Sequence, residues 1–127
     1  MPSNPIQVGF IGTGGIARWH ISHLKEIPEC RIAALCDVDA ARVKTVADPL
    51  GAAVYTDSAK LIAEAKLDAL YVCVPPFAHG DIEIRAAQRG LHMFIEKPVN
   101  LCVDSGRKAL DAIKKAGVMT QSGYSLR

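Results

Sequence analysis

The sequence has no excess of charge of either sign and no hydrophobic run long enough to cross a membrane. Its 15 Lys and Arg residues nearly balance its 13 Asp and Glu residues, which leaves a formal net charge of +2. A charge this small, spread along the chain, gives no reason to expect binding to nucleic acid or to a membrane surface. The first residues also lack the basic and apolar segments of a secretory signal, so we expect a cytoplasmic protein.

Cysteine is scarce, and its spacing matches neither a metal motif nor a redox motif. The four cysteines show no C-x-x-C spacing, and two of them fall inside apolar segments. We therefore expect buried, reduced thiols. His20 and His23 would need further ligands to hold a metal, and the sequence supplies none at a suitable spacing, so packed or boundary histidines are the favoured interpretation. The cysteines are Cys30, Cys36, Cys73 and Cys102.

The length of 127 residues suits one domain. A chain of this size buries roughly two thirds of its unfolded surface, which is enough for one core but not for two. Half of the residues are hydrophobic and 22% are charged, an ordinary globular composition. There is no repeat, linker or low-complexity tract, so we expect a single domain over residues 1–127.

The most informative segment is VGFIGTGGIA, residues 8–17, where an apolar run breaks into glycines and then resumes with helical spacing. This pattern predicts a strand, a tight turn and a helix. In a G-x-G-x-x-A turn, the first glycine makes the turn, the second lets a pyrophosphate approach, and the alanine allows close packing. The helix N-terminus then offers free N–H groups to phosphate. The candidate cofactor-binding residues here are Gly12, Thr13, Gly14, Gly15, Ile16 and Ala17.

An acidic residue follows the second predicted strand where a dinucleotide-binding fold places one. The apolar segment 31–36 ends at Asp37, which lies 20 positions after Ala17. A carboxylate there can accept hydrogen bonds from both ribose hydroxyls and would repel a 2′-phosphate. We therefore predict that NAD(H) is preferred over NADP(H), since Val38 offers no cation and Arg42 is the only nearby candidate. The alternative interpretation is a glycine turn with a purely structural role.

The rest of the chain alternates between predicted strands and helices. Six strands and five helical stretches with short connections predict an α/β fold, a doubly wound parallel sheet (Rossmann fold) with the strand order 3-2-1-4-5-6. Ligands bind beyond the carboxyl ends of such strands. The predicted strands cover residues 6–11, 31–37, 53–55, 68–74, 92–95 and 118–121, and the predicted helices cover residues 14–27, 40–50, 58–65, 79–89 and 103–116. Their predicted inward residues include Ile16, Ile21, Ile27, Leu110 and Ile113.

Four motifs in order resemble one known family: the glycine turn, VPPFAH at 74–79, EKP at 96–98 and GY at 123–124. Together they resemble the nucleotide-binding domain of the glucose–fructose oxidoreductase and inositol dehydrogenase family (Gfo/Idh/MocA), over essentially the whole chain. The resemblance implies an NAD(P)-dependent oxidoreductase that transfers a hydride between the cofactor and a sugar, cyclitol or related polyol. It also implies a second domain, absent from these 127 residues, that supplies most of the substrate pocket. The face that this domain would cover is expected to be exposed, and self-association through it is one expectation.

The resemblance assigns roles to residues after the fourth and fifth predicted strands. Lys97 would lie beside the nicotinamide and the substrate hydroxyl as the catalytic acid–base group. Glu96 would help to hold the ribose or nicotinamide side of the cofactor, and Pro98 fixes the backbone after Lys97. From the residues alone, a solvated charge pair is the alternative for Glu96 and Lys97, whereas for His79 packing at the start of its helix is favoured over a role in chemistry. The further cofactor-binding candidates are Val74, Pro75, Pro76 and His79.

Two other kinds of function fit the same sequence. The first is a non-catalytic nucleotide-binding or sensing module that acts through a partner protein. The second is a nucleotide-free structural subunit, against which the intact glycine turn argues. The substrate itself cannot be identified from these residues, because the resemblance places its selection mainly outside them.

Overall fold

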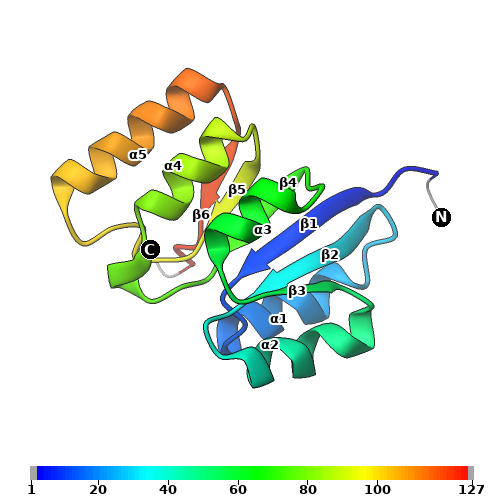
Figure 1. The fold of residues 1–127 in the computed structure, drawn as a ribbon. Helices are drawn as coiled ribbons and strands as arrows, with labels where there is room; N and C mark the ends of the chain where they lie inside the picture. The colour runs from blue at the N-terminus through cyan, green and yellow to red at the C-terminus, as the bar shows by residue number, and fades with distance from the viewer. Residues whose placement is uncertain (1–2, 126–127) are drawn as a thin grey trace.

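The computed structural model describes residues 3–125 and contains one parallel sheet with helices on both faces (Figure 1). The strands are β1 (Ile6–Ile11), β2 (Cys30–Cys36), β3 (Ala53–Tyr55), β4 (Ala69–Val72), β5 (His92–Ile95) and β6 (Thr120–Ser122). The helices are α1 (Gly15–Leu24), α2 (Ala40–Ala47), α3 (Ser58–Glu64), α4 (Asp81–Gln88) and α5 (Val103–Ala116), with short 3-10 helices at Asp48–Leu50 and Pro76–Ala78. The strand order is β3-β2-β1-β4-β5-β6, which confirms the predicted doubly wound sheet. Residues 1–2 and 126–127 of the predicted domain lie outside the described residues.

Each face of the sheet has its own hydrophobic core. On one face, α1 and α2 bury Ala17 and Val43 against Phe10 and Leu35 of the central strands. On the opposite face, α3 packs beside β2 and β3, α4 packs over β4 and β5, and Leu61 of α3 is fully buried. The central strands are therefore covered on both sides, which explains their nearly continuous apolar sequences.

The parallel register brings the carboxyl ends of the strands to one edge. Ile11 is paired with Cys36 on one side and with Val72 on the other, and Val72 is paired with Ile95. The segments that follow these strands, beginning at residues 12, 37, 73 and 96, therefore lie along the same edge. The predicted site residues belong to these segments.

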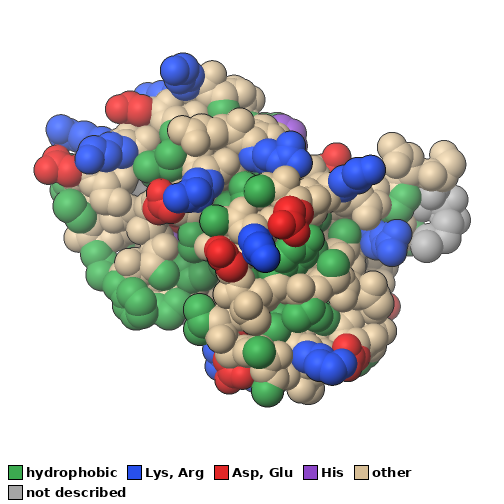
Figure 2. Space-filling view, viewed as in Figure 1, with side chains coloured by type: hydrophobic (Ala, Val, Ile, Leu, Met, Phe, Trp, Pro, Cys, Tyr) green, Lys and Arg blue, Asp and Glu red, His purple; other side chains and the backbone are tan. Residues whose placement is uncertain are grey.

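Charged side chains are mixed by sign over the visible surface. Figure 2 shows basic and acidic side chains interspersed on the face seen in Figure 1, with apolar side chains gathered toward the lower left. This distribution agrees with the small net charge of the sequence.

The first helix is shorter than predicted. α1 ends at Leu24, and the N–H groups of Glu26 and Ile27 donate to the carbonyls of His23 and Leu24 in a tighter turn. Ile27 lies beyond the end of the helix and is exposed, so its predicted inward position is wrong. The predicted inward position of Ile16, in the first turn of the helix, is also wrong, because its side chain is exposed. Pro28 stops a helix, but it does not require the helix to continue up to it.

The last helix is also oriented differently from the prediction. α5 packs against α4 at the margin of the molecule, and its buried residue is Ala109. Leu110, predicted to be buried, is 47% exposed, while Ile113 is partly buried. Burial of Cys36 and Cys73 is confirmed, but Cys102 is exposed at the start of α5, so its predicted burial is wrong. Helices at the margin of a sheet cover little of it, so their apolar pattern specifies rotation weakly.

Candidate cofactor-binding site

The glycine turn begins with a residue that only glycine can occupy. Gly12 has a φ of +92°, and a Cβ built on it would lie 2.1 Å from the carbonyl oxygen of Cys73. Its N–H donates to the carbonyl of Cys36 at 2.8 Å. The turn is therefore held between the ends of β2 and β4, as the G-x-G-x-x-A pattern predicts. Ala17, five residues later, is fully buried where α1 packs on the sheet.

The next two glycines face open space. A Cβ added to Gly14 or Gly15 would meet no atom within 4 Å, and neither residue has a positive φ. Neither protein packing nor backbone conformation therefore requires glycine at these positions. Gly14 is the N-cap of α1 and makes no side-chain capping bond, so the first N–H groups of the helix have no capping side chain as acceptor. This arrangement fits the close approach of a phosphate group.

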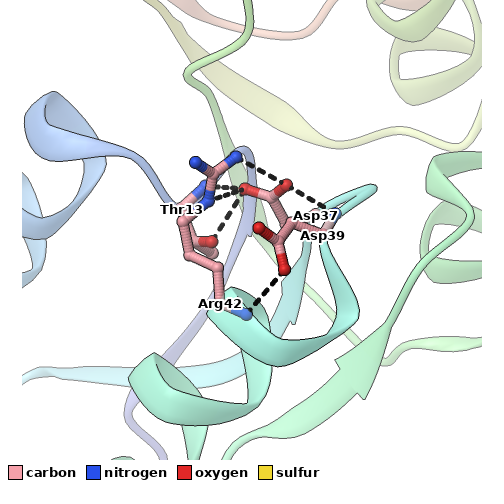
Figure 3. A network of polar contacts seen from close by, with 4 residues as sticks. All are labelled: Thr13, Asp37, Asp39 and Arg42. Carbon is pink, nitrogen blue, oxygen red and sulfur yellow. Dashed lines mark hydrogen bonds and ion pairs between the residues drawn. The ribbon is translucent and has the colours of Figure 1, made fainter.

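Asp37 lies at the centre of a polar cluster beside this turn (Figure 3). Its Oδ2 accepts hydrogen bonds from the N–H of Thr13 at 2.9 Å and from the Thr13 hydroxyl at 2.8 Å. Arg42 donates from Nε to Oδ2 at 3.2 Å and from Nη2 to Oδ1 at 3.0 Å. The N–H of Asp39 donates to Oδ1 at 3.0 Å. Thr13 is fully buried, so the cluster ties the glycine turn to the end of β2.

The cluster keeps Asp37 ionised. Burial raises the pKa of Asp37, but hydrogen bonds from Arg42, from the Asp39 N–H and from Thr13 outweigh burial and bring the pKa below its usual range. The pKa of Arg42 is raised in turn, mainly by its hydrogen bond to Asp37. The site therefore holds a fixed carboxylate paired with a guanidinium.

A cleft of about 670 Å³ opens between the glycine turn, Asp37 and the loop after β4. Of the predicted cofactor-binding residues, it is lined by Gly12, Gly14, Ile16, Asp37, Val74 and Pro75. Phe77 also lines the cleft, although no sequence pattern predicted it, and spacing alone did not predict the pairing of Arg42 with Asp37. Phe77 lies inside the VPPFAH motif, so its position after β4 was the available signal.

Glu96 faces a second hollow rather than this cleft. The second hollow, of about 580 Å³, lies between α1 and the strands β5 and β6, and Ile16 lines both spaces. There, Glu96 Oε2 lies 3.1 Å from His20 Nε2. A Cβ built on Gly123 would lie within 3 Å of the Glu96 carboxylate, so the chain after β6 passes close over it. The other residues lining the hollow include Trp19, Phe94 and Tyr124.

Lys97, Pro98 and Pro76 line neither of these two spaces. Lys97 is exposed at the end of β5, and the peptide bond between Lys97 and Pro98 is cis. The predicted catalytic residue therefore stands at the same edge of the sheet as the cleft, accessible from solvent.

His79 lies behind the cleft wall. Its side chain is fully buried, and its Nδ1 shares a hydrogen bond with Glu83 Oε1 of α4. Glu83 Oε2 also accepts from the Gly80 N–H at the start of that helix. Within residues 3–125, His79 Nε2 has no hydrogen-bond partner. These contacts agree with the packed histidine that the sequence favours.

In the part of the chain that the structure describes, no group of three His, Cys, Asp or Glu side chains could hold a metal ion. Over the same residues, no helix combines the length and the apolar character needed to span a bilayer.

The sequence profile of a family described as "Oxidoreductase family, NAD-binding Rossmann fold" matches residues 6–124. The chain belongs to this family. The resemblance found in the sequence motifs is therefore confirmed.

Named relatives and a solved structure extend this comparison. The chain is 31% identical to the myo-inositol 2-dehydrogenase of Thermotoga maritima, over 96% of this chain and 37% of the relative. It is 34% identical to a D-xylose 1-dehydrogenase (NADP(+)) of Haloferax volcanii, over 94% and 37%. A probable dehydrogenase from Thermotoga maritima has the same fold, with a TM-score of 0.88 and 31% identity over 93% and 36% of the two chains. The chain thus spans just over a third of the length of these proteins.

Proposed function

We propose that this chain is the NAD(H)-binding part of an oxidoreductase that transfers a hydride between the cofactor and a hydroxyl-bearing carbon of a sugar, cyclitol or related polyol. The substrate class rests on the relatives named as inositol and xylose dehydrogenases. These activities favour an enzyme over the sensing module. A cytoplasmic location is part of the proposal, supported by the four free cysteines.

The observation that carries the proposal is the open space in front of Gly14 and Gly15. The pyrophosphate would bind there, at the N-terminus of α1. Asp37 would receive the adenosine ribose, and Val74 and Pro75 would line the nicotinamide side of the cleft. The sign of the charge at Asp37 supports a preference for NAD(H), whose ribose carries hydroxyls instead of a 2′-phosphate.

Lys97 would act as the general acid–base group of the reaction. A bound nicotinamide would supply the hydride acceptor for the substrate carbon and, in the reverse direction, the hydride donor. Lys97 in its neutral form would take the proton from the substrate hydroxyl at Nζ as the C–H bond breaks, and would give it back in the reverse direction. Its exposed place just after β5, at the same edge of the sheet as the cleft, leaves it accessible to a substrate.

The substitution Gly14→Val tests the cofactor site. The new side chain meets no protein atom near its Cβ, so the fold should lose no more than about 1 kcal/mol, the effect of a poorer N-cap. The side chain would occupy the phosphate space, and we expect NADH affinity to fall at least about tenfold, as for the loss of one charge-assisted contact or more. Calorimetric titration and thermal unfolding measure both effects.

Gly106→Ala is the matched control for this test. It adds a methyl group inside α5 with only ordinary contacts to Asn100, and Gly106 does not line the cleft. NADH affinity should stay that of the parent. Unchanged binding in Gly14→Val would show that the dinucleotide does not use this turn.

A further inference from the structure

The carboxylate expected to bind ribose has no free acceptor position. Asp37 accepts hydrogen bonds from the N–H and hydroxyl of Thr13, from the N–H of Asp39, and from two nitrogens of Arg42. A carboxylate offers about four lone-pair positions. Two ribose hydroxyls can therefore reach Asp37 only if donors already present leave it.

Arg42 is the donor that can leave. The Thr13 side chain is fully buried, and the N–H groups of Thr13 and Asp39 belong to the turns that enter α1 and α2. The Arg42 side chain is 46% exposed, whereas that of Asp37 is 5% exposed. Arg42 supplies two donors to Asp37, the same number as the two ribose hydroxyls would supply.

The main chain at Arg42 would stay in place during such an exchange. The Arg42 N–H donates to Asp39 Oδ1 at 3.0 Å and caps the first turn of α2, and this bond does not involve the guanidinium (Figure 3). The side chain can therefore move while the helix start is kept. Among the described residues, Arg42 is the basic side chain that lines the cleft. Asp81, which also lines the cleft, is already paired with Arg85 and does not compete for Arg42.

We propose that Arg42 sets the cofactor preference of this domain with opposite effects on the two dinucleotides. It competes with the ribose hydroxyls of NAD(H) for Asp37, and it pairs with the 2′-phosphate of NADP(H), which Asp37 alone would repel. The inference rests on the proposed cofactor cleft. If Arg42 acts in this way, the difference in affinity between NAD(H) and NADP(H) is smaller than Asp37 alone would produce.

The test is a pair of calorimetric titrations, with NADH and with NADPH, on the parent chain and on Arg42→Ala. We expect NADPH affinity to fall about tenfold, the usual size of a lost charge-assisted contact. NADH affinity should rise by up to about fivefold, the size of a partly exposed ion pair that no longer competes. The Asp39 cap is kept, because it uses the backbone N–H of residue 42.

Lys44→Ala is the matched control on the same helix. Lys44 pairs with Asp48 on the exposed side of α2 and does not line the cleft, so both affinities should stay unchanged. Ionic strength gives a second readout. Added salt should weaken NADPH binding more than NADH binding in the parent, and Arg42→Ala should remove that difference.

Opposite shifts for the two cofactors would support the inference. Weaker binding of both would show that Arg42 merely holds Asp37 in position, and would overturn it, as would two unchanged affinities. A parent chain that bound neither dinucleotide would refute the cofactor cleft itself, a result distinct from any change caused by residue 42.

Discussion

At the scale of single residues, Thr13 carries more of the site than its place in the glycine motif indicates. Its hydroxyl and N–H both donate to one oxygen of Asp37, and its side chain is fully buried. These two bonds tie the glycine turn to the end of β2. Because the motif leaves this position open, the sequence pattern gave no hint of the role.

Thr13→Val should therefore reduce stability and weaken NADH binding together. The substitution keeps the shape of the side chain and removes one hydrogen bond to a buried carboxylate, which costs about 1–3 kcal/mol. Urea unfolding at pH 7 measures the loss. Thr45→Val is the control: the Thr45 hydroxyl donates to the Ala41 carbonyl on the exposed face of α2, and its loss should cost about 0.5 kcal/mol or less.

The same comparison at low pH tests whether the charge of Asp37 is involved. The pKa of Asp37 in the folded chain lies below its unfolded value of about 3.9, so its ionised form stabilises the fold above about pH 4. That contribution is lost as the pH falls through the folded-state pKa. Because the unfolded-state pKa is the same in both proteins, the difference in unfolding free energy between the parent and Thr13→Val should shrink only once the pH falls below the folded-state pKa of Asp37 in the variant, which loss of the hydroxyl raises. An Asp37 pKa that was equal in the two folded proteins, followed by NMR of its carboxyl group, would show that the hydroxyl acts independently of that charge.

At the scale of elements, Gly12 is what lets β1 turn beside β4. Gly12→Ala should lower the unfolding free energy by more than about 3 kcal/mol, because it combines a left-handed backbone with a Cβ only 2.1 Å from the Cys73 carbonyl oxygen. Gly106→Ala, at an unstrained position inside α5, should instead raise it by roughly 0.5–1 kcal/mol. Chemical denaturation of the two variants measures the contrast. Equal effects would mean that the β1 turn relaxes around the methyl group.

The sheet was predictable because its signals are local. Strands β1 to β5 are largely apolar and end in turn residues, whereas β6 is short, polar and exposed. The crossover rule then limits the possible strand orders. The rotation of α5 and the end of α1 were not predictable in the same way. Both depend on how much of each helix is packed against neighbouring elements, which the sequence does not specify. Leu110 and Ile27 are both exposed, so this packing does not reach them.

The candidate site was predictable as positions but not as contacts. Gly12, Gly14 and Asp37 follow from spacing, and the cleft brings them together. The bidentate contact of Arg42 depends on a rotamer that crosses between elements, and spacing carries no information about it. The direction of Glu96 could have been found: it has the same strand parity as Phe94, and both face the α1 side.

At the scale of the whole molecule, the two faces of the sheet are covered unequally. α3, α4 and α5 cover the face opposite α1, whereas α1 and α2 pack against the other face over β1 and β2. Beyond α1, the apolar side chains around the second hollow meet solvent, and Trp19 is 56% exposed. Lys97 lies at the neighbouring strand end without a wall around it. The described residues therefore place the proposed cofactor cleft beside an open edge of the sheet.

We accordingly expect the 127-residue chain, tested alone, to bind NADH without turning over a polyol. Binding needs the glycine turn and Asp37, which are formed here within one fold. Turnover needs the substrate held in line with the nicotinamide and water kept away, and an exposed Lys97 on an open edge provides neither. The measurement is NADH absorbance with NAD⁺ and a panel of sugars and cyclitols, beside a binding titration of the same sample. Turnover within the ordinary enzyme range of about 1 to 10³ per second would contradict this expectation and show that the single domain orients substrate by itself.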